Sequence, residues 1–96
     1  MHLLPETTPI YLWSDMDYGG FSILAQLRKQ VSMRIQPCLM DIATFDQYAH
    51  LSHPLTQSDA RNLKRLLFNP ILEDIHPVIE HLLQQGLKLE QEAIQI

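Results

Sequence analysis

The chain has 96 residues, 46% of them hydrophobic, which suits one small domain over residues 1–96 with a modest core. Its net charge of -4 gives no overall attraction to nucleic acids or anionic lipids, so contact with nucleic acid must be local. No apolar stretch approaches the roughly 20 residues that span a bilayer, and the start lacks a signal-peptide pattern. We therefore expect a cytoplasmic protein without membrane contact, in which the single cysteine, Cys38, is a small buried hydrophobe.

The first predicted element is a strand at residues 10–14. Its β-formers and aromatic residues favour burial on both faces. The strand stops at Asp15 and Asp17, and Gly19 and Gly20 then allow a tight turn and the approach of a phosphate to the backbone. Because open α/β sheets bind ligands at the carboxyl ends of their strands, this point is a candidate divalent-metal site.

A helix at residues 21–30 and a second strand at residues 35–40 follow. The helix has one apolar stripe, formed by Phe21, Leu24, Leu27 and Val31 with Ile23 beside it. A strand, a crossover helix and a strand of these lengths predict a parallel pair with a right-handed connection. The second strand ends at Asp41, so Asp41 could lie near Asp15 and Asp17.

The remaining chain is mainly helical. Residues 43–51 predict a short helix and residues 50–55 a loop, and Thr56 or Ser58 caps a helix that extends to about residue 68. That helix turns Leu63, Leu66 and Leu67 inward and presents an outward basic face, made of Arg61, Lys64 and Arg65. This face could contact a phosphate backbone, although a solvated surface is the default interpretation.

A further apolar periodicity covers residues 71–85. Its core candidates are Ile75, Ile79, Leu82 and Leu83, with a kink or break at Pro77 and an end at Gly86. Residues 87–94 alternate at first and then become helix-like, and we assign them to no element. The fold class predicted from the whole pattern is α/β, with a short parallel sheet, flanking helices and a helical C-terminal part.

The acids decide the chemistry. Mg²⁺ and Mn²⁺ take oxygen ligands, and one or two protein carboxylates with water and phosphate complete their shell. Asp15 and Asp17 match that requirement, but aspartates after strands also cap turns and helices. For Asp41, capping of the following helix and metal binding are equal alternatives.

Three blocks of sequence resemble a known family. Residues 13–21 (WSDMDYGGF), residues 39–41 (LMD) and residues 89–94 (LEQEAI) occur in the order found in the C-terminal Toprim domain of the JetD subunits of bacterial Wadjet anti-plasmid systems. This Rossmann-like domain is related to that of topoisomerase VI. The family usually has glycine where this chain has Ser14, and histidine where it has Gly19, and neither change removes a carboxylate.

The resemblance implies a nuclease that uses Mg²⁺ or Mn²⁺ to cleave double-stranded DNA and works with an SMC-like complex of the same defence system. Asp15 and Asp17 match the family's Asp-x-Asp and would be catalytic metal ligands, while Asp41 and Glu92 match further acids. Toprim domains also carry a catalytic glutamate after an earlier strand. The only acid before Asp15 is Glu6, in a Pro-flanked lead-in, so we expect a fragment that lacks the upstream strand and cleaves nothing alone.

Two other classes compete with the nuclease. A strand ending in Asp-x-Asp also opens haloacid-dehalogenase-type phosphatases, but that family has threonine or valine where this chain has Gly19, and a longer domain. The non-enzyme alternative is a folding, DNA-docking or dimerisation module. A homodimer would add to the modest core of so short a chain.

Overall fold

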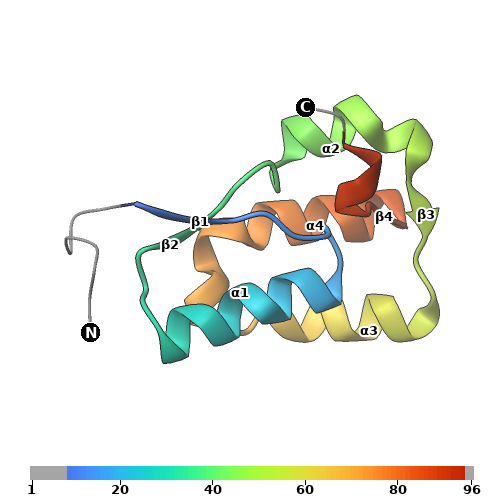
Figure 1. Ribbon diagram of the computed structural model, residues 1–96. Coiled ribbons are helices and arrows are strands. Elements are labelled where there is room, and N and C mark those ends of the chain that lie inside the picture. Colours follow the sequence, from blue (N-terminus) through green and yellow to red (C-terminus); the bar gives the residue numbers. More distant parts are fainter. Residues whose placement is uncertain (1–8, 95–96) are drawn as a thin grey trace.

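The computed structural model describes residues 9–94, which form a small mixed α/β fold (Figure 1). Strand β1 (Ile10–Leu12) leads into helix α1 (Tyr18–Gln30), and the chain then returns as strand β2 (Ile35–Pro37). The two strands pair in parallel, with Ile10 opposite Ile35. The predicted fold class and the predicted parallel strand–helix–strand unit are confirmed.

Helices flank this sheet. They are α2 (Ile42–Tyr48) with the 3-10 turn η1 (Ala49–Leu51), α3 (Gln57–Leu66), the 3-10 segment η2 (Pro70–Ile75) and α4 (His76–Gln85). Helix α1 packs against α3 and η2, and α4 packs against both α3 and α2 (Figure 1). None of the helices in residues 9–94 combines the length and apolarity that crossing a membrane requires.

The C-terminal segment returns to the centre of the molecule. Gly86 ends α4 with a φ of 68°, and strand β4 (Leu87–Lys88) then pairs antiparallel with strand β3 (His53–Pro54). A last 3-10 turn, η3 (Gln91–Ala93), follows. The predicted stop at Gly86 is confirmed, whereas the loop predicted at residues 50–55 contains a strand.

One apolar core joins the helices to the sheet. Phe21, Leu24, Phe45 and Leu63 are fully buried, as is Met16 in the loop after β1. The predicted core positions on α3, η2 and α4 are confirmed for Leu63, Leu66, Ile75, Ile79 and Leu82, while Leu67 and Leu83 are partly buried against the same core. Burial of this apolar surface is the main force that holds the helices on the sheet.

The strands are shorter and more open than predicted. β1 is not buried on both faces, since 64% of Tyr11 is exposed, and within residues 9–94 it pairs with β2 alone. β2 ends at Pro37 instead of residue 40, since Leu39 has a positive φ of 54° that turns the chain out of extended geometry. Cys38, which follows β2 directly, is only partly buried.

Helix boundaries also differ from the prediction. α1 begins at Tyr18 and not at Phe21, because Asp17 caps it, and the predicted stripe is wrong for Val31 and Ile23, which are exposed. α3 ends at Leu66, before the predicted end at about residue 68. Pro77 lies in the first turn of α4, where its missing N–H costs no hydrogen bond. The break predicted at Pro77 is confirmed, because the 3-10 segment η2 ends at Ile75 and α4 begins at His76.

Candidate metal centre

Asp15 and Asp17 lie in the loop between β1 and α1, at the carboxyl end of the strand. Asp17 is the N-cap of α1, and its Oδ1 accepts a hydrogen bond of 2.7 Å from the backbone N–H of Gly20. A Cβ atom at Gly20 would lie 1.9 Å from the carbonyl oxygen of Asp15. The loop can therefore turn this tightly only because residue 20 has no side chain.

Close packing explains the glycine at position 20. The space beside Gly20 is filled by the Asp15 carbonyl, and a Cβ atom at Gly19 would meet Asp17 Oδ1 at 3.5 Å. We expected both glycines to let a phosphate approach the backbone. That stays a prediction, and the structure shows that Gly20 lets the start of α1 approach the loop.

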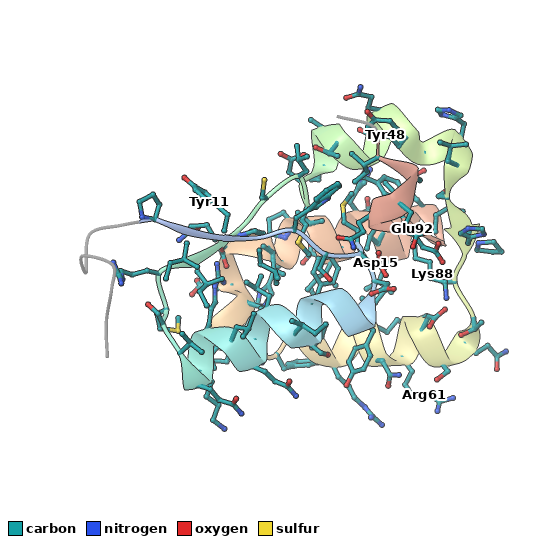
Figure 2. All side chains as sticks on the ribbon, viewed as in Figure 1. Tyr11, Asp15, Tyr48, Arg61, Lys88 and Glu92 are labelled. Atoms are coloured by element: carbon teal, nitrogen blue, oxygen red, sulfur yellow. The ribbon has the colours of Figure 1, made fainter. Side chains whose placement is uncertain are left out.

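The C-terminal segment runs beside this loop. Met16 and Leu89 form an antiparallel bridge, in which the Met16 N–H donates to the Leu89 carbonyl at 2.8 Å and the Leu89 N–H donates back at 3.2 Å. Both side chains are buried. In addition, Asp15 Oδ1 accepts a hydrogen bond of 2.7 Å from the backbone N–H of Gln91. The first and third sequence blocks, far apart in the chain, are thus adjacent in space (Figure 2).

The bridge brings charged residues of two distant segments together. Asp15 and Asp17 flank Met16 in the chain, and Lys88 and Glu90 flank Leu89. Since Met16 and Leu89 point into the core, side chains at the neighbouring positions point outward. We call these four outward residues, Asp15, Asp17, Lys88 and Glu90, the acidic edge.

Lys88 is held at the acidic edge by α3. Its Nζ donates to Asp59 Oδ2 at 2.9 Å, and both side chains are partly buried, with 29% of Lys88 and 26% of Asp59 exposed. Asp59 also belongs to the capping box of α3, in which it exchanges hydrogen bonds with Thr56. This pair raises the pKa of Lys88, so the ammonium group stays charged.

Burial raises the pKa of Asp17 above its ordinary value. The negative charge of Asp15 acts in the same direction, while the hydrogen bond from Gly20 and the charge of Lys88 oppose it. A half-buried carboxylate beside a second carboxylate lacks part of its solvation and is repelled by its neighbour. A divalent cation between the two would relieve both effects.

The donor set of the pair fits a hard divalent cation. Each carboxylate uses Oδ1 for a hydrogen bond to the backbone, and within residues 9–94 no protein donor meets either Oδ2. Two carboxylates with water and phosphate are a common Mg²⁺ shell. Asp15 and Asp17 would hold the ion, and metal binding here stays a prediction.

The structure brings fewer acids together than the sequence suggested. Asp41 caps α2 and accepts a hydrogen bond of 2.8 Å from the Thr44 N–H, and hydrogen bonds from Thr44 lower its pKa. Glu92 is exposed in η3, next to the residue that binds Asp15. Among the described residues, no three His, Cys, Asp or Glu side chains are arranged to hold one metal ion, so neither acid completes a three-carboxylate group with the pair.

The basic face on α3 is exposed as predicted. Arg61, Lys64 and Arg65 all lie on the surface. Arg61 projects from the outer side of α3, away from Asp15 (Figure 2). Arg61 therefore lies on a surface separate from the acidic edge.

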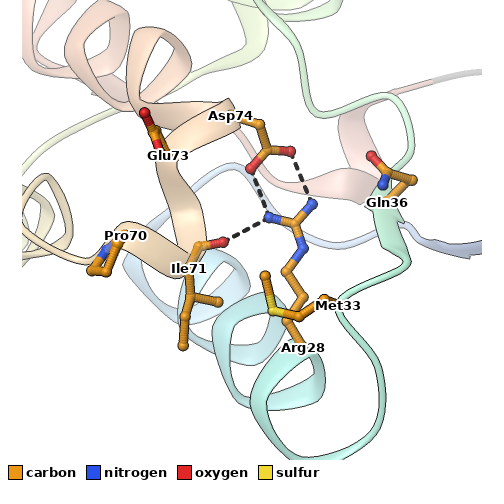
Figure 3. A pocket seen from close by; sticks show the side chains of 7 residues that line it. All are labelled: Arg28, Met33, Gln36, Pro70, Ile71, Glu73 and Asp74. Atoms are coloured by element: carbon orange, nitrogen blue, oxygen red, sulfur yellow. Dashed lines mark hydrogen bonds and ion pairs between the residues drawn. The ribbon is translucent and has the colours of Figure 1, made fainter.

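A surface depression of about 540 Å³ lies at the other end of α1. Its lining residues are Arg28, Met33, Gln36, Pro70, Ile71, Glu73 and Asp74 (Figure 3). Arg28 is 5% exposed, and its guanidinium donates to both carboxylate oxygens of Asp74, at 2.6 and 2.9 Å, and to the carbonyls of Ile35 and Ile71. Since the guanidinium N–H groups already donate to these acceptors, we assign Arg28 a structural role.

Lys88 and Asp59 were missed by the sequence reasoning. The alternation of Leu87, Lys88 and Leu89 is the signal that could have found Lys88, because a short strand with two inward leucines turns the lysine outward. For Asp59, the signal is its position three residues after Thr56, which is the spacing of a capping box. Neither signal says which strand or helix the side chain will meet.

The comparisons with known proteins agree with the three-block resemblance. The sequence model of the family described as "Wadjet protein JetD, C-terminal" matches residues 2–96. The Wadjet protein JetD of Bacillus cereus (strain Q1) is 27% identical over 94 residues, which cover 98% of this chain and 23% of that protein. The chain thus spans less than a quarter of the length of this relative. No solved structure gives a significant match.

Proposed function

The chain belongs to the family of Wadjet JetD C-terminal domains, and from this membership we propose that it is part of a metal-dependent DNA endonuclease of a plasmid-defence system. The domain would be of the Toprim type, with Mg²⁺ or Mn²⁺ as the cofactor. Duplex DNA would be the substrate, and an SMC-like complex of the same system would be the partner in the cytoplasm. Since the chain matches 23% of its relative, these are proposals about a larger protein.

One observation carries the metal part of the proposal. Asp15 and Asp17 lie in the loop after β1 and beside residues 89–91, through the Met16–Leu89 bridge and the hydrogen bond from Gln91 to Asp15. Of the blocks that resemble the family, residues 13–21 thus contain the two carboxylates and residues 89–94 lie beside them. This arrangement is what a metal site at the carboxyl end of a parallel strand requires.

The residues of the chain would act mainly by position. The Gln91 N–H orients Asp15, and the Gly20 N–H orients Asp17, so that each Oδ2 is left for a ligand. When bound, the ion would polarise a phosphoryl oxygen and orient the attacking water. Arg61, Lys64 and Arg65 could contact the DNA backbone outside the site.

Titration of the chain with Mn²⁺ by calorimetry tests the site. We expect binding by the wild-type chain and its loss in the Asp15→Asn, Asp17→Asn double variant, which keeps side-chain size but removes two negative charges. The Glu73→Gln, Glu80→Gln variant is the matched control, because it removes two exposed carboxylates elsewhere. Equal binding by the wild type and the Asp15, Asp17 variant would overturn the site.

A second candidate function is a dimerisation module. The observation that favours it is the outer edge of β1, where 64% of Tyr11 and 39% of Trp13 are exposed. The Cys38 N–H donates to the Leu12 carbonyl, so Leu12 bonds toward β2, and alternation turns the N–H and C=O of Tyr11 to the other edge. A strand from a second copy could pair there.

A further inference from the structure

We propose that Lys88 is the phosphate-binding residue of the acidic edge and that Asp59 positions it. This inference rests on the proposed function, because it needs a divalent cation at Asp15 and Asp17. Lys88 is next to Leu89 and Asp17 is next to Met16, the two residues of the bridge, and the charges of Lys88 and Asp17 act on each other. The Lys88 ammonium group donates to Asp59 at 2.9 Å. A phosphate that bridges the metal and the protein would meet this ammonium group.

The negative charges of the acidic edge explain why a phosphate would need the ammonium group of Lys88 in addition to the metal. Asp15, Asp17 and Glu90 are all negative, and the whole chain has a net charge of -4, so an approaching phosphate is repelled. A divalent ion cancels only part of that field. Lys88 is the cation that the structure places among these acids, whereas Arg61, Lys64 and Arg65 lie on the outer surface of α3.

The geometry of Lys88 leaves it able to bind an anion. An ammonium group has three N–H donors, and the described contacts of Lys88 use one, toward Asp59. Partial burial of the Lys88–Asp59 pair limits the positions open to the side chain. The ammonium is therefore charged, oriented and still able to donate, which are the properties of a lysine that contacts phosphate.

Lys88 should affect metal and phosphate in opposite directions. The ammonium repels a cation at the two aspartates and attracts a phosphate at the same place. Removing the unit charge of Lys88 beside these ligands should change the affinity for the metal and the affinity for phosphate by about fivefold each. Replacing a residue with a purely structural role would not strengthen the binding of one ligand while weakening the binding of the other.

The test uses the whole chain with two probes, Mn²⁺ alone in calorimetry and a fluorescent DNA duplex in the presence of Ca²⁺. For Lys88→Gln we expect tighter Mn²⁺ binding and weaker DNA binding, and for Lys88→Arg we expect wild-type values for both. Lys29→Gln is the matched control, because this exposed lysine lies at the far end of α1. Circular dichroism checks that each variant is folded.

Asp59→Asn supplies an independent variant, since Lys88 keeps its charge but loses its ionic partner. We expect weaker Mn²⁺ binding than in the wild type, opposite in sign to Lys88→Gln, because a negative charge near Asp17 is removed. Unchanged affinities in Lys88→Gln, together with metal binding that depends on Asp15 and Asp17, would overturn the role of Lys88 alone. Absence of metal binding by the wild type would overturn the proposed function itself.

Discussion

Gly20 is the residue whose missing side chain sets the geometry of the candidate metal centre. Its backbone N–H donates to the capping carboxylate of Asp17, and its Cα approaches the Asp15 backbone so closely that a Cβ atom would lie 1.9 Å from the carbonyl oxygen. The same Cβ atom would lie 2.9 Å from Ser14 Oγ. One position thus couples both aspartates to the start of α1.

Gly20→Ala should therefore destabilise the fold and weaken metal binding together. The added methyl group forces the start of α1 away from the loop, and such overpacking costs about 1–3 kcal/mol. Chemical denaturation measures the first effect and Mn²⁺ titration the second. Gly19→Ala is the control, since its Cβ atom would be in ordinary contact at 3.5 Å from Asp17 Oδ1. A Gly20→Ala chain as stable as Gly19→Ala would contradict the packing argument.

How far single residues could be predicted depends on the range of their contacts. The positions of Asp15 and Asp17 after a strand follow from local sequence, because an apolar run that stops at two acids indicates a strand followed by a loop, although β1 itself ends at Leu12, before the predicted residue 14. The partners of Asp15 and Lys88 could not be predicted. Gln91 lies 76 residues from Asp15, and Asp59 lies 29 residues from Lys88, so only the folded chain brings them together.

At the scale of elements, Arg28 ties three parts of the chain together. It projects from α1, and its donors reach the carbonyl of Ile35 in β2 and, in η2, the carbonyl of Ile71 and the carboxylate of Asp74 (Figure 3). Helical periodicity gives the face of a residue, but it does not reveal that a buried cation has found acceptors on other elements.

Arg28→Lys should lower the free energy of unfolding by about 1–3 kcal/mol, because an ammonium group cannot donate to all these acceptors at once. Thermal or urea denaturation measures the change. Lys29→Ala, at the exposed neighbouring position, should stay within about 0.5 kcal/mol of the wild type. Equal stability of Arg28→Lys and wild type would show that the network is dispensable.

The interaction of Arg28 with Asp74 also predicts that the stability of the fold depends on pH. Hydrogen bonds from Arg28 lower the pKa of Asp74, so the folded chain keeps this carboxylate ionised more readily than the unfolded chain. The ionised Asp74 carboxylate therefore stabilises the folded chain. This stabilisation is complete above the ordinary aspartate pKa of about 3.9 and is lost as the pH falls through the lower pKa of Asp74 in the folded state. In Asp74→Asn, the free energy of unfolding should fall less at acid pH than in the wild type, because this carboxylate is no longer there to be protonated. Identical pH profiles for the variant and the wild type would contradict the assignment.

For the whole molecule, the two outer edges of the sheet are unlike. Along β2, Pro37 has no N–H to donate, and the Ile35 carbonyl already accepts from Arg28 Nε at 2.8 Å. These features close that edge to further strands. Along β1, Tyr11 turns its backbone groups outward. Sequence alone could not separate the edges, since that requires knowing which strand each polar group meets.

The edge of β1 gives a test of the dimerisation module. If two copies pair through β1, sedimentation equilibrium should show a dimer that forms with rising concentration. Tyr11→Pro should abolish it, because proline removes the outward N–H while the bonds from Leu12 to β2 remain. Tyr11→Phe keeps the backbone donor and the aromatic surface, so it should dimerise like the wild type. A chain that stays monomeric at all concentrations, or a Tyr11→Pro variant that dimerises normally, would exclude this edge as the interface and leave the acidic edge as the functional surface to pursue.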